Sequence, residues 1–160
     1  MRKKKFEFDF EVYESIDELT KEDAGLLNNA KVISENAYAP YSNFCVGAVA
    51  RLKNGKIVNG SNQENASFPV GLCAERVLLA SVFSLYPNIP IETIAVSYKG
   101  PHGSDHPVAP CGLCRQSLFE FEIQSKHPVR LILGGMKGKV FILSSASLLL
   151  PLAFSSKELK

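Results

Sequence analysis

Apolar and polar residues alternate near the start of the chain and then change to a helical spacing. In residues 6–13, apolar side chains occupy the even positions, and acidic side chains and Tyr13 occupy the odd ones. This period of two predicts a strand with one apolar and one mostly acidic face, either at a sheet edge or in an arm. Residues 20–23 resemble a helix-capping box, and apolar residues then recur at helical spacing up to Pro40. We therefore expect a first helix that runs to about Tyr38.

Two β-rich runs follow this helix, over residues 44–52 and 56–60. Asn54 and Gly55 join them, a pair that favours positive φ at both central positions of a tight turn. The pattern predicts an antiparallel hairpin.

Helices and strands alternate in the remainder of the chain. We expect helices over 73–85, 111–122 and 144–150, strands over 91–98, 129–133 and 140–143, and a loop over 99–110 that is rich in Gly, Pro and His. This order predicts an α/β fold with three layers, a mixed β-sheet carrying helices on both faces. We expect a single domain over residues 1–160, with residues 1–19 as an N-terminal extension of no assigned role.

Composition agrees with one packed domain: the chain has 160 residues, 46% of them hydrophobic and 21% charged. The formal net charge of +2, with the densest basic run at residues 2–5, is too small to predict a nucleic-acid surface. The most apolar stretch, residues 148–154, is short and contains Pro151, so we expect no membrane span. Acidic residues follow the basic start and interrupt any signal-peptide core, which favours a cytoplasmic location.

Three of the four cysteines carry the main chemical prediction. Cys111 and Cys114 have the spacing that places both on one face of a helix's first turn, and Cys73 opens another predicted helix. Helix N-termini favour thiolates, so the three sulfurs form a candidate zinc site. Three protein ligands leave a fourth position for water, which Glu75 is close enough to face. Arg76 and Arg115 are placed to offset the negative charge of the sulfurs.

Together these segments resemble the small cytidine deaminases, whose zinc signature contains Ala-Glu after a His or Cys and a later Pro-Cys-x-x-Cys. The sequence matches it at Cys73-Ala74-Glu75 and Pro110-Cys111-Gly112-Leu113-Cys114. Further resemblance lies in residues 38–48, 62–66 and 150–154, so that it covers roughly residues 20 to 158. Cys73 in place of His is similar to the homotetrameric, all-cysteine branch of the family.

The resemblance implies hydrolytic deamination of cytidine and deoxycytidine in pyrimidine salvage, with one zinc ion per subunit. It implies Glu75 as the proton shuttle and Arg76 as the residue that restores zinc acidity through the sulfurs. The implied substrate contacts are Phe44 beside the pyrimidine, Asn62 and Glu64 on the ribose, the Ala74 backbone amide on the base, and Phe154 in a neighbouring subunit's pocket. It also implies a homotetramer whose substrate is a free nucleoside, with neither nucleic acid nor membrane as partner.

Alternative interpretations remain at this stage. Cys111 and Cys114 alone fit a redox pair, and Cys45 could close a structural zinc site as a fourth ligand, although core packing is the ordinary role for this strand cysteine. His102, His106 and His127 fit polar loop residues. As whole-protein alternatives, we keep a deaminase of an aminonucleoside antibiotic of the blasticidin S type and a non-catalytic, zinc-stabilised interaction module.

Overall fold

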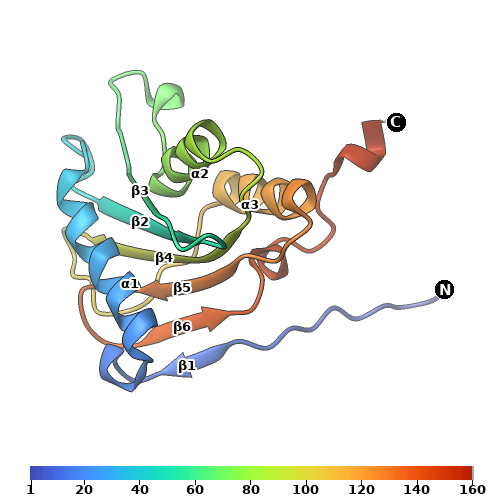
Figure 1. Cartoon of the computed structure of the whole chain (residues 1–160), viewed down its shortest axis with the longest axis horizontal. Coiled ribbons are helices and arrows are strands. Elements are labelled where there is room, and N and C mark those ends of the chain that lie inside the picture. The colour runs from blue at the N-terminus through green and yellow to red at the C-terminus, as the bar shows by residue number, and fades with distance from the viewer. Residues whose placement is uncertain (160) are drawn as a thin grey trace.

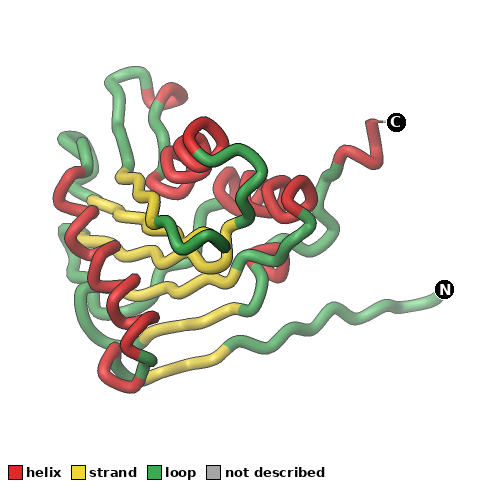
Figure 2. Tube along the Cα trace, in the orientation of Figure 1, coloured by secondary structure: helices red, strands yellow, loops and turns green. Residues whose placement is uncertain are grey.

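A six-stranded mixed sheet organises the chain in the computed structural model, which describes residues 1–159 (Figures 1 and 2). Its order is β1-β6-β5-β4-β2-β3, and within the described residues only the β4–β5 pair is parallel. The strands are β1 (Glu11–Tyr13), β2 (Cys45–Leu52), β3 (Ile57–Ser61), β4 (Ile91–Lys99), β5 (Arg130–Gly134) and β6 (Val140–Leu143). The helices are α1 (Lys21–Ile33), α2 (Ala74–Leu85) and α3 (Gly112–Ser125), with single 3-10 turns between elements.

Helices cover both faces of this sheet (Figure 1). On one face, Leu26, Leu27 and Ala30 of α1 pack against alternate residues of the central strands, such as Ala95 and Ile132. On the other face, α2 and α3 enclose the larger apolar cluster, which includes Leu78, Leu118, Ile94 and Leu133. Because β4 is covered on both faces, its residues are almost continuously buried, including the polar Thr93 and Ser97. The predicted three-layer α/β fold is confirmed.

Helix α1 begins where the capping pattern predicts and ends earlier than predicted. The Thr20 side chain accepts a hydrogen bond from the Asp23 amide at 3.2 Å, which satisfies one free donor of the first turn. The helix ends at Ile33 rather than near Tyr38, and residues 34–36 tighten into a 3-10 turn. There the Ser34 hydroxyl donates to the Lys31 carbonyl at 2.7 Å, so local side-chain bonding competes with continuation of the helix.

The β2–β3 hairpin forms as predicted, but its turn has a different geometry. Only Gly55 has a left-handed backbone, with φ of 79°, whereas two positive φ values were expected. The Gly55 amide donates to the Leu52 carbonyl at 2.8 Å, and the Leu52 amide donates to the Lys56 carbonyl at 2.9 Å. One glycine therefore suffices to reverse the chain.

A close helix–strand contact sets the position of α2. A Cβ atom on Gly60 would lie 2.6 Å from the Leu78 amide nitrogen and 2.7 Å from the Ala74 carbonyl oxygen. Only a residue without a side chain allows β3 to approach the backbone of α2 this closely. The start of α2, which carries Cys73 and Glu75, is consequently held against the end of β3.

The N-terminal alternation yields only a short edge strand. Glu11–Tyr13 pairs antiparallel with β6 through the register Val12 to Phe141, while residues 6–10 continue outward without a strand partner in the described chain. The prediction of an edge strand or an arm is thus met in both senses. Among residues 1–159, no helix combines the length and the apolar character needed to cross a membrane.

A partly buried ion pair joins α1 to β5 and leads to a stability prediction. Arg130 donates to both carboxylate oxygens of Asp23, at 2.7 and 2.9 Å, and the Asp23 side chain is only 9% exposed. Asp23→Asn should lower the free energy of unfolding at pH 7 by about 2 kcal/mol, the usual range for a hydrogen bond to a charged group. Urea unfolding measures this loss.

The pH dependence of this pair follows from its pKa. Hydrogen bonding to Arg130 lowers the Asp23 pKa below its ordinary 3.8, so folding favours the ionised carboxyl. Its contribution is present above pH 3.8 and is lost as pH falls through the lower, folded-state pKa. The wild-type advantage over Asp23→Asn should therefore narrow below about pH 4. Glu22→Gln, which alters an exposed partner of Arg51, should change stability far less; equal losses in the two variants would contradict the prediction.

Candidate active site

One edge of the sheet gathers the residues that the sequence singles out. Because β2 runs antiparallel to both β3 and β4, the start of β2 lies beside the ends of the other two strands, with Cys45 opposite Lys99 and Gly47 opposite Ser61. The N-termini of α2 and α3 reach the same edge, and a cavity of about 710 Å³ opens between them. This edge is therefore the candidate active site.

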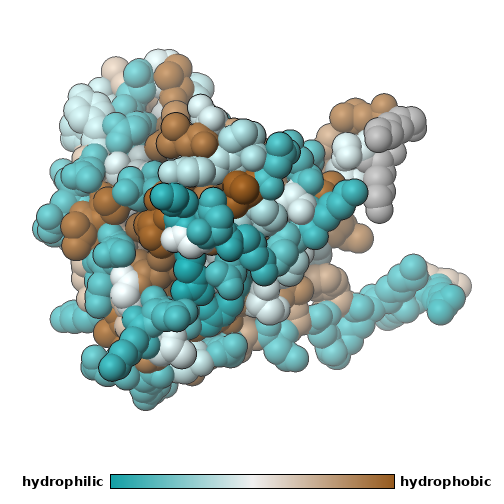
Figure 3. Space-filling model, viewed as in Figure 1, coloured by the Kyte–Doolittle hydropathy of each residue, from teal (hydrophilic) through white to brown (hydrophobic). Residues whose placement is uncertain are grey.

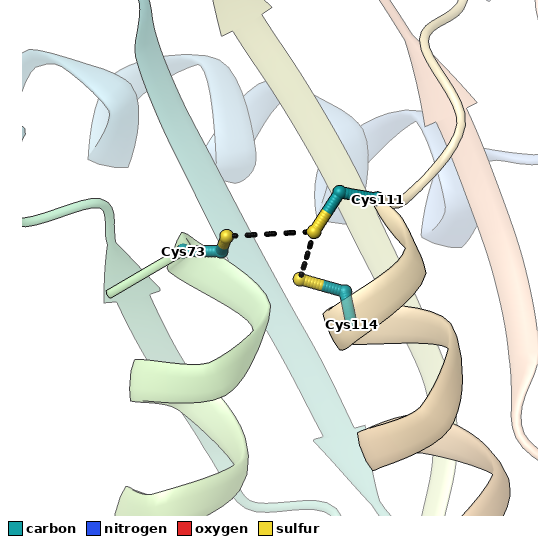
Figure 4. Close-up of side chains that lie close together, drawn as sticks. All are labelled: Cys73, Cys111 and Cys114. Atoms are coloured by element: carbon teal, nitrogen blue, oxygen red, sulfur yellow. Dashed lines mark hydrogen bonds between the residues drawn. The ribbon is translucent and has the colours of Figure 1, made fainter. Parts of the chain in front are cut away.

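Three cysteines that line this cavity point toward one another (Figure 4). The Cys111 sulfur lies 3.7 Å from that of Cys73 and 3.5 Å from that of Cys114, and all three sulfurs lie within 4.8 Å of one another. A tetrahedral zinc ion with bonds of about 2.3 Å separates its sulfur ligands by about 3.8 Å. The three side chains thus fit a zinc ion, and among residues 1–159 the metal-ligating group contains no fourth side chain.

Backbone conformation explains why these sulfurs are free to bind a metal. Cys73 and Cys111 are the N-caps of α2 and α3, both with extended backbones, and neither side chain caps its own helix. Their sulfurs turn instead toward each other, close to the unpaired N–H groups of two first turns. Such positions favour thiolates, the form that binds zinc.

The cysteines of the cluster differ in how readily they lose a proton. The pKa of Cys73 is lowered to about 6, first because its thiolate accepts hydrogen bonds from Cys114 and Cys111, and further by the positive charge of Arg76. The same interaction with Cys73 raises the pKa of Cys114, a buried thiol. The charge of Arg76 is the smallest of these influences on Cys73, and its role at the cluster stays a prediction.

Arg115 makes its hydrogen bonds to the backbone on either side of its helix. Its guanidinium donates to the Pro110 carbonyl at 2.7 Å and to the Leu149 carbonyl at 3.2 Å. Arg115 thereby ties the segment before Cys111 to the C-terminal part of the chain, and its hydrogen bonds are made to backbone oxygens rather than to the sulfurs. That the positive charge of Arg115 offsets the charge of the sulfurs stays a prediction.

Glu75 lies in the first turn of α2 and lines the cavity beside the cysteines, although it is only 5% exposed. Burial raises the pKa of its carboxyl, an effect that hydrogen bonding to its own amide and to Cys114 partly offsets. A buried carboxyl with a raised pKa that reaches a cavity is the usual form of a proton-transfer group.

The predicted ribose contacts lie at the outer part of the cavity. Asn62 accepts a hydrogen bond from the Val46 amide at 2.7 Å and donates to the Phe44 carbonyl at 2.9 Å, which leaves its second N–H for a ligand. Glu64 accepts from the Tyr41 amide at 2.9 Å and from the Ser42 hydroxyl and amide. These bonds lower the Glu64 pKa and keep an exposed carboxylate ionised at the mouth.

The other two predicted contacts differ in their placement. Ala74 is the fully buried first residue of α2, so that its backbone amide belongs to the helix N-terminus at the cavity. Phe154 is 59% exposed, and its carbonyl accepts a hydrogen bond from Gln116 at 3.0 Å. Within the described chain Phe154 does not line the cavity, and its assignment to a neighbouring subunit's pocket stays a prediction.

Sequence reasoning missed the residue behind Phe44. The Tyr98 ring stacks on Phe44 with centroids 5.0 Å apart, and its hydroxyl lies 3.4 Å from the His106 ring nitrogens. His106, expected to be an ordinary polar loop residue, thus links the 99–110 loop to the cavity wall. The alternation of β4 could have indicated this, because Val96 and Tyr98 fall on one face and both line the cavity.

Comparisons with known proteins agree with this geometry. The family model for the cytidine and deoxycytidylate deaminase zinc-binding region matches residues 20–127. The cytidine deaminase of Halalkalibacterium halodurans is 34% identical over 134 residues, covering 84% of this chain and 95% of the relative. That of Mycobacterium tuberculosis is 41% identical over 108 residues, covering 66% of this chain and 77% of the relative.

Solved structures give the same result. The crystal structure of cytidine deaminase from Burkholderia pseudomallei superposes with a TM-score of 0.72 at 40% identity, covering 85% of this chain and all of that one. These relatives and this structure favour neither a redox pair, an antibiotic deaminase nor a non-catalytic zinc module.

Proposed function

The chain belongs to the cytidine and deoxycytidylate deaminase family, and from this premise we propose how its site works. The activity is zinc-dependent hydrolytic deamination of cytidine, which yields uridine and ammonia. The observation that carries the proposal is Glu75, a buried carboxyl that reaches one cavity together with three sulfurs at zinc-ligand spacing.

Cys73, Cys111 and Cys114 would hold the zinc ion, one per chain. A zinc ion held there, with its fourth position open, would supply a water molecule whose pKa is lowered from its bulk-water value toward about 7. Three anionic sulfurs make zinc less able to lower the pKa of its water. In this proposal the positive charge of Arg76 offsets part of their negative charge and so preserves the effect of zinc on the water. In this proposal the substrate ring lies in the cavity against Glu75, which lines it.

Glu75 then carries protons between the reacting atoms. It takes a proton from the water and delivers it to ring N3, which makes C4 electrophilic. After the hydroxide adds to C4, Glu75 takes the proton of the new C4 hydroxyl and passes it to the amine, so that the C4–N bond breaks, the C4=O bond forms and ammonia leaves. Its raised pKa supports this role, because a carboxyl that holds its proton more tightly is better able to deliver it to the substrate after taking it from the water.

Base and ribose contacts complete the proposal. Phe44, backed by Tyr98, provides an aromatic wall for the pyrimidine. The Ala74 amide, at a helix N-terminus, is suited to donate to the base O2. The free N–H of Asn62 and the ionised Glu64 are suited to ribose hydroxyls, and deoxycytidine fits the same contacts through its remaining hydroxyls.

Glu64 leads to a prediction about substrate class. An ionised carboxylate at the ribose end repels a phosphate, so cytidine should be converted far faster than its monophosphate. Glu64→Gln should lower kcat/KM for cytidine about 10-fold to 100-fold, the equivalent of a charged hydrogen bond. Steady-state assays of both substrates measure this. Glu35→Gln, an exposed carboxylate outside the cavity, is the matched control, and an unchanged kcat/KM in Glu64→Gln would contradict the ribose assignment.

We further propose a homotetramer. Phe68 and Leu113 line the cavity yet are 74% and 65% exposed, and large apolar side chains this exposed at a site mouth are suited to cover by another chain. Phe154 would then enter the neighbouring pocket. We also propose that residues 1–160 form one deaminase domain and that the enzyme serves pyrimidine salvage in the cytoplasm.

Cytidine turnover measured with zinc quantified in the same sample tests the proposed function. The change in ring absorbance should be proportional to zinc content up to one ion per chain. Zinc-loaded protein without turnover would support the interaction module, and faster turnover of an aminonucleoside antibiotic would support that alternative. Light scattering on the same sample gives the mass of the assembly.

A further inference from the structure

The N-terminal arm, residues 1–10, stands away from the body of the domain (Figure 3). Its exposed fractions are 56% at Phe6, 38% at Phe8 and 46% at Phe10, large for three aromatic residues in one segment. Pairing with β6 begins at Glu11, and within the described residues the arm before Glu11 has no strand partner. The arm therefore presents free backbone groups together with an apolar face, which is the surface that strand pairing uses.

The aromatic residues form a continuous row on one face of the arm. Ring centroids lie 6.2 Å apart between Phe6 and Phe8, 6.3 Å apart between Phe8 and Phe10, and 5.0 Å apart between Phe10 and Phe141 of β6. The odd positions carry charged side chains, and among them Lys5 contacts Glu7. The arm thus already has the two faces of a strand, and β1 anchors it to the sheet.

The order of charges along the arm defines a complementary partner. Residues 2–5 are all basic, whereas Glu7, Asp9 and Glu11 are acidic. When two such arms lie antiparallel with Phe6 opposite Phe6, Lys5 faces Glu7 and Lys3 faces Asp9, twice each by symmetry. In a parallel, in-register pair every charged residue would lie opposite the identical residue, and like charges directly opposite each other destabilise strand pairing.

The aromatic face is complementary in the same register. Phe8 then lies opposite Lys4, and Phe10 lies opposite Arg2, so each cation meets an aromatic ring. We propose that the arms of two copies of this chain pair as an antiparallel two-stranded ribbon centred on Phe6. The partner of the arm is a second copy of this chain, because the charge pattern of the arm is complementary to itself. This argument does not depend on the proposed catalytic function.

A ribbon of two strands is marginal on its own. Here each strand continues from β1, which is fixed on β6, so the arm is attached to a folded sheet. An anionic polymer would use the basic residues but would gain nothing from Glu7 and Asp9. The proposal therefore predicts that both halves of the charge pattern are required.

Cysteine cross-linking on the zinc-loaded full chain tests the register. In Phe6→Cys the two new thiols face each other, whereas in Phe10→Cys they are eight positions apart, about 27 Å at 3.4 Å per residue. Because a disulfide needs Cα atoms within about 7 Å, Phe6→Cys should give covalent dimers on the order of tenfold faster than Phe10→Cys. Equal rates in the two variants, or the unmodified chain cross-linking as fast, would overturn the proposal.

Charge reversal in the Phe6→Cys background tests complementarity. Lys3→Glu with Lys5→Glu makes one arm wholly acidic at the odd positions, and Glu7→Lys with Asp9→Lys makes another wholly basic there. Each alone should cross-link several-fold more slowly, and an equal mixture should recover the original rate as mixed dimers. Failure of the mixture to recover would overturn the antiparallel pairing. Unchanged cytidine turnover in each variant verifies that the domain is intact.

Discussion

Glu75→Gln should abolish cytidine turnover while the protein keeps its zinc. The substitution retains the size of the side chain in a buried position but removes its capacity to accept and release a proton. Because the same carboxyl handles each proton transfer, we expect kcat to fall by about 10⁴-fold, the upper range for one acid–base group. Absorbance assays give kcat, and elemental analysis gives the zinc content of the same sample.

Two measurements separate this result from a general structural effect. Glu120→Gln alters an exposed carboxylate on α3 and should leave kcat within a factor of about two, since isolated surface substitutions have small effects. Equilibrium binding of cytidine to Glu75→Gln should persist, because the ribose contacts lie elsewhere in the cavity. Substantial turnover by zinc-loaded Glu75→Gln would show that another group moves the protons.

The metal cluster was predictable because each ligand obeys a local rule. Cys111 and Cys114 share the first turn of one helix, and Cys73 opens another, so that spacing along the chain already decides which sulfurs face the same direction. Local rules do not predict that the N-termini of α2 and α3 lie next to each other. That contact depends on Gly60, which lets α2 approach β3, and on the parallel placement of β4 and β5 around α3.

The outer part of the cavity was less predictable, because its contacts join residues far apart in the chain. Tyr98 meets Phe44 only through the β2–β4 register, in which Val46 lies opposite Tyr98. Glu64 binds the 41–42 turn, where the chain continues into Asn43 with a left-handed backbone, φ 53°. Hydrophobic periodicity defines strands but leaves such registers open.

Replacement of the buried ligand should show how the metal is held. Cys114→Ser should weaken zinc binding by more than about 100-fold, since even an outer-shell partner of a metal ligand contributes 10-fold to 100-fold. Cytidine turnover should disappear with the metal. Cys45→Ser is the matched control: Cys45 lies at the start of β2 on the same sheet edge, but its sulfur is outside the three-sulfur group.

Zinc content after competition with a chelator distinguishes the two variants. We expect Cys45→Ser to retain one ion per chain and full turnover, because the cluster keeps its three sulfurs and the fourth position stays open to water. Release of zinc from Cys45→Ser would mean that a fourth thiolate closes the site, as in structural zinc centres. A closed site has no position for the water that Glu75 must deprotonate, so this outcome would remove the deaminase mechanism as well.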